Sequence, residues 1–326
     1  MAVYFLNLKT FGRSTNSSAV SAAAYRSGER IRDERTGTIY DHSDRQDVLS
    51  KGIVLPGKFV NDDVSWARDR SSLWNAAEQA ETRKNARVAR EYLVALPAEI
   101  SPDQRLQLVR GFSAELADRY GFALDFAIHA AREFPGSDPR NFHAHMLATT
   151  REVNIEGLGA KTTLEMHDTR RQILGLEPSI YELLHVRERW ANVTNQALRE
   201  AHIETRIDHR SLDAQGIDRE PRLHIPKAAF EMERHGYRSA LADRLRAQYE
   251  ARVAARLERS AAAENTAASH GDATPAKRQT LEEIRREARE NWLRMRQSVD
   301  QGHGGQTADS PPSAKKDRIH DDDFAR

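Results

Sequence analysis

Two short apolar segments, joined by a stretch that contains proline and glycine, constrain the fold of this 326-residue chain more than any other feature. Residues 122–130 (FALDFAIHA) and 142–150 (FHAHMLATT) have the length and composition of buried β-strands. The segment between them contains Pro135, Gly136 and Pro139, which favour a hairpin-like connection. We therefore expect the two strands to pair antiparallel in one sheet.

Histidines in these two strands form the most informative pattern. Alternate side chains of a strand share a face, so His143 and His145 point the same way and the apolar residues between them point the other way. If the strands pair antiparallel, His129 on the preceding strand sits beside that pair. The alternative interpretation is that the H-x-H motif binds no metal and that His129 is a hydrogen-bonded core residue.

Neutral imidazoles on one face would hold a single metal and leave coordination positions for water or a substrate oxygen, as catalytic sites do. The ligand set suits manganese, zinc, cobalt or nickel, and suits magnesium less naturally. The expected cofactor is a divalent ion, with manganese or magnesium first and zinc, cobalt or nickel as alternatives. The chain has no cysteine, which excludes thiolate metal sites, disulfides and a cysteine nucleophile.

The remaining pattern predicts an α+β domain built on an antiparallel sheet with flanking helices. The expected strands are 2–9, 37–41, 52–55 and 87–96, and the expected helices are 19–26, 65–84 and 101–120. Residues 180–202 and 226–256 are expected to be mainly helical. Gly157 and the residues up to Thr162 are interpreted as a glycine turn. We expect no membrane span, because no apolar run approaches the roughly 20 residues that one needs, and no secretory signal.

Tyr25 stands at the end of a helix of very small residues, in basic surroundings. Five basic side chains and one acid, Glu29, lie near it in the sequence: Lys9, Arg13, Arg26, Arg30 and Arg32. Positive charge favours the phenolate that a tyrosine nucleophile needs, and the same groups could hold phosphates. The alternative is that Tyr25 packs on the core. Tyr4 and Tyr40 are competing candidates, the first in a strand and the second in a polar hairpin-like stretch.

Taken together, the histidines and Tyr25 make the sequence similar to a known family. It resembles the MobA/MobL plasmid mobilisation relaxases of the H-U-H endonuclease superfamily, in which U is an apolar residue. The resemblance covers residues 1–235 and rests on five stretches in order: AVYFLNLKTFGRS, SAVSAAAYRSGERI, VAREYLVALP, FAIHAAREFPGSDPRNFHAHMLATTR and TRIDHRSLDAQGIDREP. It implies the H-U-H relaxase fold, with a five-stranded type of antiparallel sheet.

The resemblance also implies a reaction. Tyr25 occupies the position of the nucleophile that cuts one DNA strand at an origin of transfer and stays joined to the 5′ phosphate, so that the strand can later be rejoined. His129, His143 and His145 occupy the positions of the metal ligands. The implied partners are single-stranded and hairpin origin DNA, with accessory proteins of the relaxosome and a secretion coupling protein. The expected location is the bacterial cytoplasm.

Other residues are secondary candidates. Glu91 could orient a histidine or accept the tyrosine proton, or it could be a solvated residue; related proteins carry a second acid where this chain has Leu93, which weakens a role as base. Arg151 is a candidate phosphate contact, together with Lys9, Arg13, Arg26 and Arg30. Asp208, His209 and Arg210 receive no role beyond local structure or DNA contact.

Two alternative functions remain at this point. A rolling-circle replication initiator of the same superfamily usually has its histidine motif before its tyrosine, and here the tyrosine comes first. A non-catalytic origin-binding protein would not need the tyrosine and the histidines. The chain has no G-x-x-x-x-G-K-[ST] motif for an ATP-driven helicase, and its net charge of +1 argues against a uniformly basic DNA-coating protein.

The expected domains follow from these observations and from composition. Residues 1–235 form the relaxase domain, 236–263 a helical extension, 264–278 a linker, 279–298 a charged helix and 299–326 a disordered tail.

Overall fold

A computed structural model describes residues 2–13, 18–131 and 138–269. Within them the chain forms two compact units, one ending at Ile217 and one beginning at Asp218. The expected domain boundary at residue 235 stays a prediction. No helix among the described residues is both long enough and apolar enough to cross a membrane.

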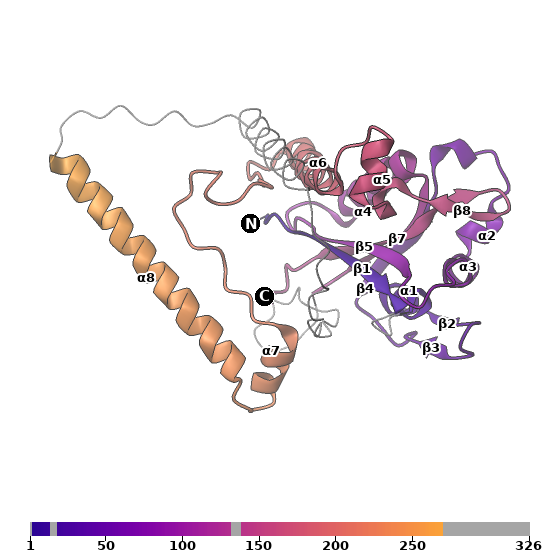
Figure 1. The fold of residues 1–326 in the computed structure, drawn as a ribbon, viewed down its shortest axis with the longest axis horizontal. Coiled ribbons are helices and arrows are strands. Elements are labelled where there is room, and N and C mark those ends of the chain that lie inside the picture. The colour runs from indigo at the N-terminus through magenta and orange to yellow at the C-terminus, as the bar shows by residue number, and fades with distance from the viewer. Residues whose placement is uncertain (1, 14–17, 132–137, 270–326) are drawn as a thin grey trace, which may run out of the picture. The chain divides into compact units, whose positions relative to one another are not determined.

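The first unit is built on an antiparallel sheet, which confirms the predicted α+β class (Figure 1). Five strands follow one another in the order β1-β5-β7-β6-β4, and β8 pairs with β7 outside this path. The strands are β1 (Leu6–Gly12), β4 (Val48–Val54), β5 (Arg87–Ala95), β6 (Phe122–His129), β7 (His143–Asn154) and β8 (Gly157–Lys161). The expected pairing of the two apolar segments is thus the pairing of β6 with β7, at the centre of the sheet.

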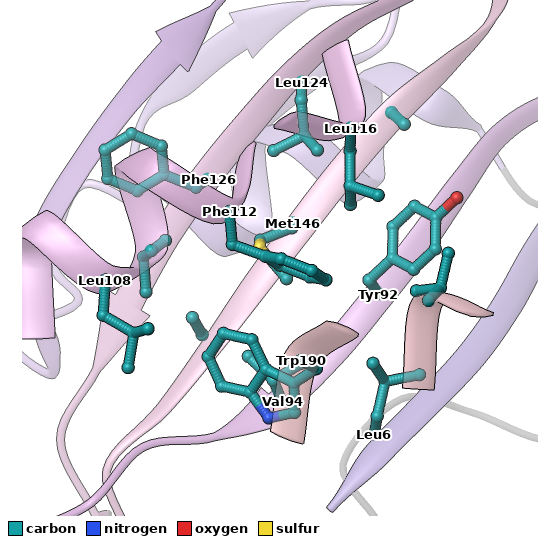
Figure 2. Close-up of a cluster of buried hydrophobic side chains, with 14 of the residues drawn as sticks. Leu6, Tyr92, Val94, Leu108, Phe112, Leu116, Leu124, Phe126, Met146 and Trp190 are labelled. Atoms are coloured by element: carbon teal, nitrogen blue, oxygen red, sulfur yellow. The ribbon is translucent and has the colours of Figure 1, made fainter. Parts of the chain in front are cut away.

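One face of the sheet packs against α4 (Pro102–Tyr120) and α6 (Ser179–Glu200). Helix α4 begins as its sequence predicts, because Ser101 and Gln104 form a capping box and Pro102 occupies the first turn. Its Phe112 ring lies 5.0 Å from the Trp190 ring of α6. Figure 2 shows these side chains gathered with Met146 of β7 in one buried cluster. This apolar layer fixes the central strands that carry the histidines on their other face.

The opposite face of the sheet packs against α1 (Ala19–Ser27) and α3 (Arg70–Gln79), which lie together on that side in Figure 1. Buried alanines at positions 22, 23 and 24 let the backbone of α1 approach the sheet closely. Ser18 caps the first turn of α1, and Gly28 ends the helix in the left-handed conformation, with φ +60°. A hairpin of β2 (Arg30–Arg32) and β3 (Ile39–Asp41) follows.

Several expected boundaries were wrong. Strand β1 begins at Leu6 rather than residue 2, and β4 begins at Val48 rather than residue 52. The helix expected over 65–84 is two helices, α2 (Ser65–Arg68) and α3, because Asp69 has extended backbone and caps α3 by accepting from the Ser72 N–H. The stretch interpreted as a glycine turn contains β8, which is too short and glycine-rich to show strand alternation.

Short elements complete the first unit. They are the 3-10 turns η2 (Gly57–Phe59) and η3 (Thr163–Glu165) and the helix α5 (Asp168–Ile173). None of them was expected from the sequence, because each is shorter than the span over which an apolar period can be recognised.

The second unit contains α7 (Lys227–Arg234) and α8 (Ala240–Ser269). Residues 226–256 were expected to be mainly helical, and they are; Gly236, with φ +81°, separates the two helices. Arg246 of α8 pairs with Glu233 of α7, with Nη2 2.6 Å from Oε2. Helix α8 continues to Ser269 and so enters the predicted linker. The predicted charged helix 279–298 and disordered tail lie outside the described residues.

Candidate active site

The register of β6 and β7 brings the histidines together as the sequence predicts. His129 lies directly opposite His143, and His145 lies opposite Ala127, which is on the same face of β6 as His129. The ring centroids are 4.8 to 5.4 Å apart. One possible ligand atom from each of the three rings lies within 4.8 Å of the others. The face they share is the one covered by α1.

Each imidazole is oriented by a hydrogen bond through one of its nitrogens. His129 Nε2 lies 2.7 Å from the carbonyl oxygen of Arg26. His143 Nδ1 lies 3.1 Å from the carbonyl oxygen of Asn141, and His145 Nδ1 lies 2.7 Å from Oε1 of Glu91. Because these acceptors require the N–H on that side of each ring, the second nitrogen carries the lone pair that a metal needs.

The environment keeps these imidazoles neutral. Burial, with the neighbouring His145 and His143, lowers the pKa of His129 to about 2. Burial and the neighbouring His145 lower the pKa of His143 to about 4. Burial also lowers the pKa of His145, although Glu91 opposes this effect. Neutral imidazoles are the form that binds metals, so the donor set fits a divalent ion.

Glu91 and Arg26 form a buried ion pair on this same face, and each is less than 5% exposed. Arg26 donates from Nη2 to Oε2 of Glu91 at 2.9 Å and from Nε to Oε1. Burial opposes ionisation of Glu91, but Arg26 and His145 outweigh it and hold the pKa of this carboxyl far below its usual range. Glu91 therefore lies where it can orient His145. Arg26 is buried in this pair, and its contact with DNA stays a prediction.

Tyr25 lies in the last turn of α1, one residue before Arg26. Its ring meets the His42 ring edge-on, with centroids 5.2 Å apart. The guanidinium of Arg45 lies over the Tyr25 ring, 4.2 Å from the ring centroid. Its Nη1 donates to the Tyr25 carbonyl at 2.7 Å. Sequence analysis missed His42 and Arg45, because the polar segment between β3 and β4 has no period or motif that would single them out.

The other basic candidates have partners of their own in the structure. Arg13 pairs with Glu78, and Arg151 pairs with Glu81 at 2.8 Å; both acids are buried. These pairs give the two arginines a structural role. The ammonium of Lys9 lies 5.1 Å from the centroid of the Phe11 ring. Arg30 is exposed, with Nε 3.7 Å from Oδ2 of Asp41.

The competing tyrosines and the Asp208 segment have other surroundings. Tyr4 donates to the Arg187 carbonyl at 3.4 Å, and burial raises its pKa to about 12. Tyr40 lies in β3, opposite Ile31. Asp208 and Arg210 form a local turn, with Oδ2 2.6 Å from Nη2.

The antiparallel sheet thus carries three histidines on the face covered by α1, and Tyr25 lies in the last turn of that helix. The MobA/MobL family model matches residues 17–235, and the chain belongs to this family. The predicted family resemblance is thereby confirmed.

Relatives and a solved structure agree with this assignment. "Mobilization protein MobL" of Acidithiobacillus ferridurans is 34% identical over 281 residues, which cover 80% of this chain and 71% of that protein. "Probable mobilization protein MobA" of Bifidobacterium longum is 33% identical over 267 residues, but the match covers 45% of that longer protein. A structure described as "Molecular Basis of Vancomycin Resistance Transfer in Staphylococcus aureus" superimposes with a TM-score of 0.52 at 27% identity, covering 64% of this chain and 100% of that one.

Proposed function

We propose that this protein is a mobilisation relaxase that nicks one DNA strand at an origin of transfer, with Tyr25 as the nucleophile. The observation that carries the proposal is the double connection between Arg26 and the histidines. The carbonyl of Arg26 binds His129, and its guanidinium reaches His145 through Glu91. Tyr25 is the neighbouring residue, and Arg45 lies over its ring with Nη2 3.3 Å from Nδ1 of His129.

The proposed reaction exchanges one phosphate ester for another. The phenolic oxygen of Tyr25 forms a bond to phosphorus and gives up its proton to solvent. The bond from phosphorus to the 3′ oxygen breaks, and that oxygen takes up a proton to become a 3′ hydroxyl. The DNA stays joined to Tyr25 through its 5′ phosphate. Because no ester is hydrolysed, attack by a 3′ hydroxyl on the phosphotyrosine can rejoin a strand.

The other residues of the site have separate proposed roles. His129, His143 and His145 would hold a divalent ion, which polarises the scissile phosphate and stabilises charge on its oxygens. Glu91 positions His145 and neutralises Arg26, rather than touching the substrate. Origin DNA in single-stranded and hairpin form is the proposed partner, and Lys9 and Arg30 remain candidate contacts. Accessory proteins and a secretion coupling protein stay predictions from the family.

A covalent-adduct assay tests this proposal. Purified full-length protein is incubated with manganese and labelled single strands tiled across the mobilisation region of its own plasmid, then separated on a denaturing protein gel. We expect a labelled, metal-dependent adduct with the wild type and with Tyr40→Phe, and none with Tyr25→Phe, which should still bind the DNA. An adduct with Tyr25→Phe would refute the nucleophile. Binding without an adduct for the wild type would favour a non-catalytic origin-binding protein.

A further inference from the structure

Arg45 connects the nucleophile to the histidine face. It lies in the segment between β3 and β4, and its side chain is 10% exposed. The guanidinium lies over the Tyr25 ring, while Nη2 lies 3.3 Å from Nδ1 of His129. A two-point pair with Asp47, including a bond of 2.8 Å from Nε to Oδ1, holds the guanidinium in this place.

The contact with His129 uses the atom that a metal would need. Nε2 of His129 is committed to the carbonyl of Arg26, so Nδ1 carries the lone pair. In the structure Nη2 of Arg45 donates to that lone pair. A metal ion and the Arg45 N–H cannot share it, and two cations at this separation also repel each other. Metal binding therefore requires the guanidinium to turn away from His129.

We propose that Arg45 blocks His129 until metal and DNA arrive together, and that its guanidinium then binds the scissile phosphate beside Tyr25. This inference rests on the proposed function and adds a substrate-binding residue to it. The contact with the Tyr25 ring keeps the guanidinium next to the phenol, where an attacked phosphate must lie. The planar N–H groups of arginine match phosphate oxygens, whose negative charge removes the repulsion between the two cations. Metal and DNA should consequently bind cooperatively.

The test measures manganese affinity by isothermal titration calorimetry, with and without an uncleaved origin strand, in a Tyr25→Phe background that cannot form the adduct. Without DNA, we expect the variant with Arg45→Met to bind manganese about tenfold more tightly than the Tyr25→Phe protein that keeps Arg45. Adding DNA should tighten manganese binding in the presence of Arg45 and have much less effect in Arg45→Met.

Lys51→Met is the matched control. Lys51 also donates to a carbonyl at the end of α1, that of Ser27 at 2.8 Å, and its acidic partner is Glu29. We expect this variant to leave manganese affinity without DNA unchanged. Because Asp47 Oδ2 lies 3.9 Å from His129 Nδ1, Arg45→Met is also compared in an Asp47→Asn background, where the gain in affinity should persist. Thermal unfolding checks each fold, and Arg45→Gln replaces Arg45→Met if the latter unfolds.

The outcomes separate this inference from the proposed function. Unchanged manganese affinity in folded Arg45→Met and Arg45→Gln, or no manganese binding by any of the proteins, overturns the Arg45 proposal. If Lys51→Met gains as much manganese affinity as Arg45→Met does, the proposal is also overturned, because loosening of α1 would then be the cause. If the wild type binds manganese but forms no adduct on any origin strand, the nicking function fails, while competition at His129 is still measured without DNA.

Discussion

His129 of β6 and Arg26 of α1 are joined by a hydrogen bond of 2.7 Å between Nε2 and the carbonyl oxygen. Two side chains from later in the chain also donate to carbonyls at this end of α1. Arg45 donates to the carbonyl of Tyr25 at 2.7 Å, and Lys51 donates to the carbonyl of Ser27 at 2.8 Å. The last carbonyls of a helix lack partners within it and favour positive charge nearby. A candidate metal ligand thus also anchors the helix that carries Tyr25.

Replacing His129 should affect both the metal and the helix. We expect His129→Gln and His143→Gln each to weaken manganese binding about 10- to 100-fold or more, because each removes a ligand. Only His129→Gln should also loosen the end of α1. Hydrogen exchange of the Gly28 and Glu29 amides, which bond to the Ala24 carbonyl, should become about tenfold faster in that variant. Equal exchange in both variants would show that the His129–Arg26 bond does not anchor the helix.

Glu91→Gln should strongly destabilise the fold. It leaves the guanidinium of Arg26 buried without its compensating charge, and breaking a buried pair in this way costs about 3–5 kcal/mol. The free energy of unfolding in urea measures the effect. Arg30→Gln removes an exposed pair with Asp41 and should change stability very little. Similar stability losses in the two variants would contradict the buried-pair interpretation.

The ion pairs of Glu29 should make stability depend on pH. Burial opposes ionisation of Glu29, but Lys51 and Arg70 outweigh it and lower the pKa of Glu29 below its ordinary value near 4.5. The unfolded chain therefore binds a proton at higher pH than the folded chain does. The stabilisation is fully present above about pH 4.5 and is lost as the pH falls through the folded pKa.

Glu29→Gln tests this pH dependence. At neutral pH the variant should be up to about 1 kcal/mol less stable than the wild type, since solvent partly screens the pairs. The difference should shrink as the pH falls below about 4.5, when measured by urea unfolding over a pH series. A difference that stays constant across the series would assign the loss to packing instead of charge.

The histidine face could be predicted because it depends on two local properties of the chain. Strand alternation places His143 and His145 on one side, and the antiparallel pairing of β6 with β7 brings His129 beside them. The burial of Arg26 in α1 could not be predicted, because its partner Glu91 is 65 residues away, in strand β5. Arg45 was missed for a similar reason: its contacts depend on how the segment after β3 folds against α1.

Element boundaries were predicted less well than element types. The capping box at Ser101 marks the start of α4 in the sequence itself, and the structure agrees. Asp69 divides α2 from α3 through a backbone conformation that an apolar stripe does not reveal. Strand β8 forms by pairing with the last residues of β7. Its own short, glycine-containing sequence has too little pattern to identify it as a strand.

Gly28, which ends α1, lies against the strand next to the histidines. It has φ +60°, and a Cβ atom there would lie 3.2 Å from Cγ2 of Val48, the residue paired with His129. Gly28→Ala should therefore cost about 1–2 kcal/mol of stability for the left-handed backbone, and more for the displaced neighbour. It should also slow adduct formation, because Tyr25 lies in the same turn.

Gly37→Ala separates the effect of the left-handed backbone from the effect of the contact with Val48. Gly37 has a similar φ of +72°, but a Cβ atom there would meet nothing within 4 Å. We expect a stability loss of about 1 kcal/mol and a normal rate of adduct formation. Val48→Ala should recover part of the stability lost in Gly28→Ala, because it removes the crowding methyl group. If the double variant shows only additive losses, the close approach of α1 to β4 does not limit the position of Tyr25.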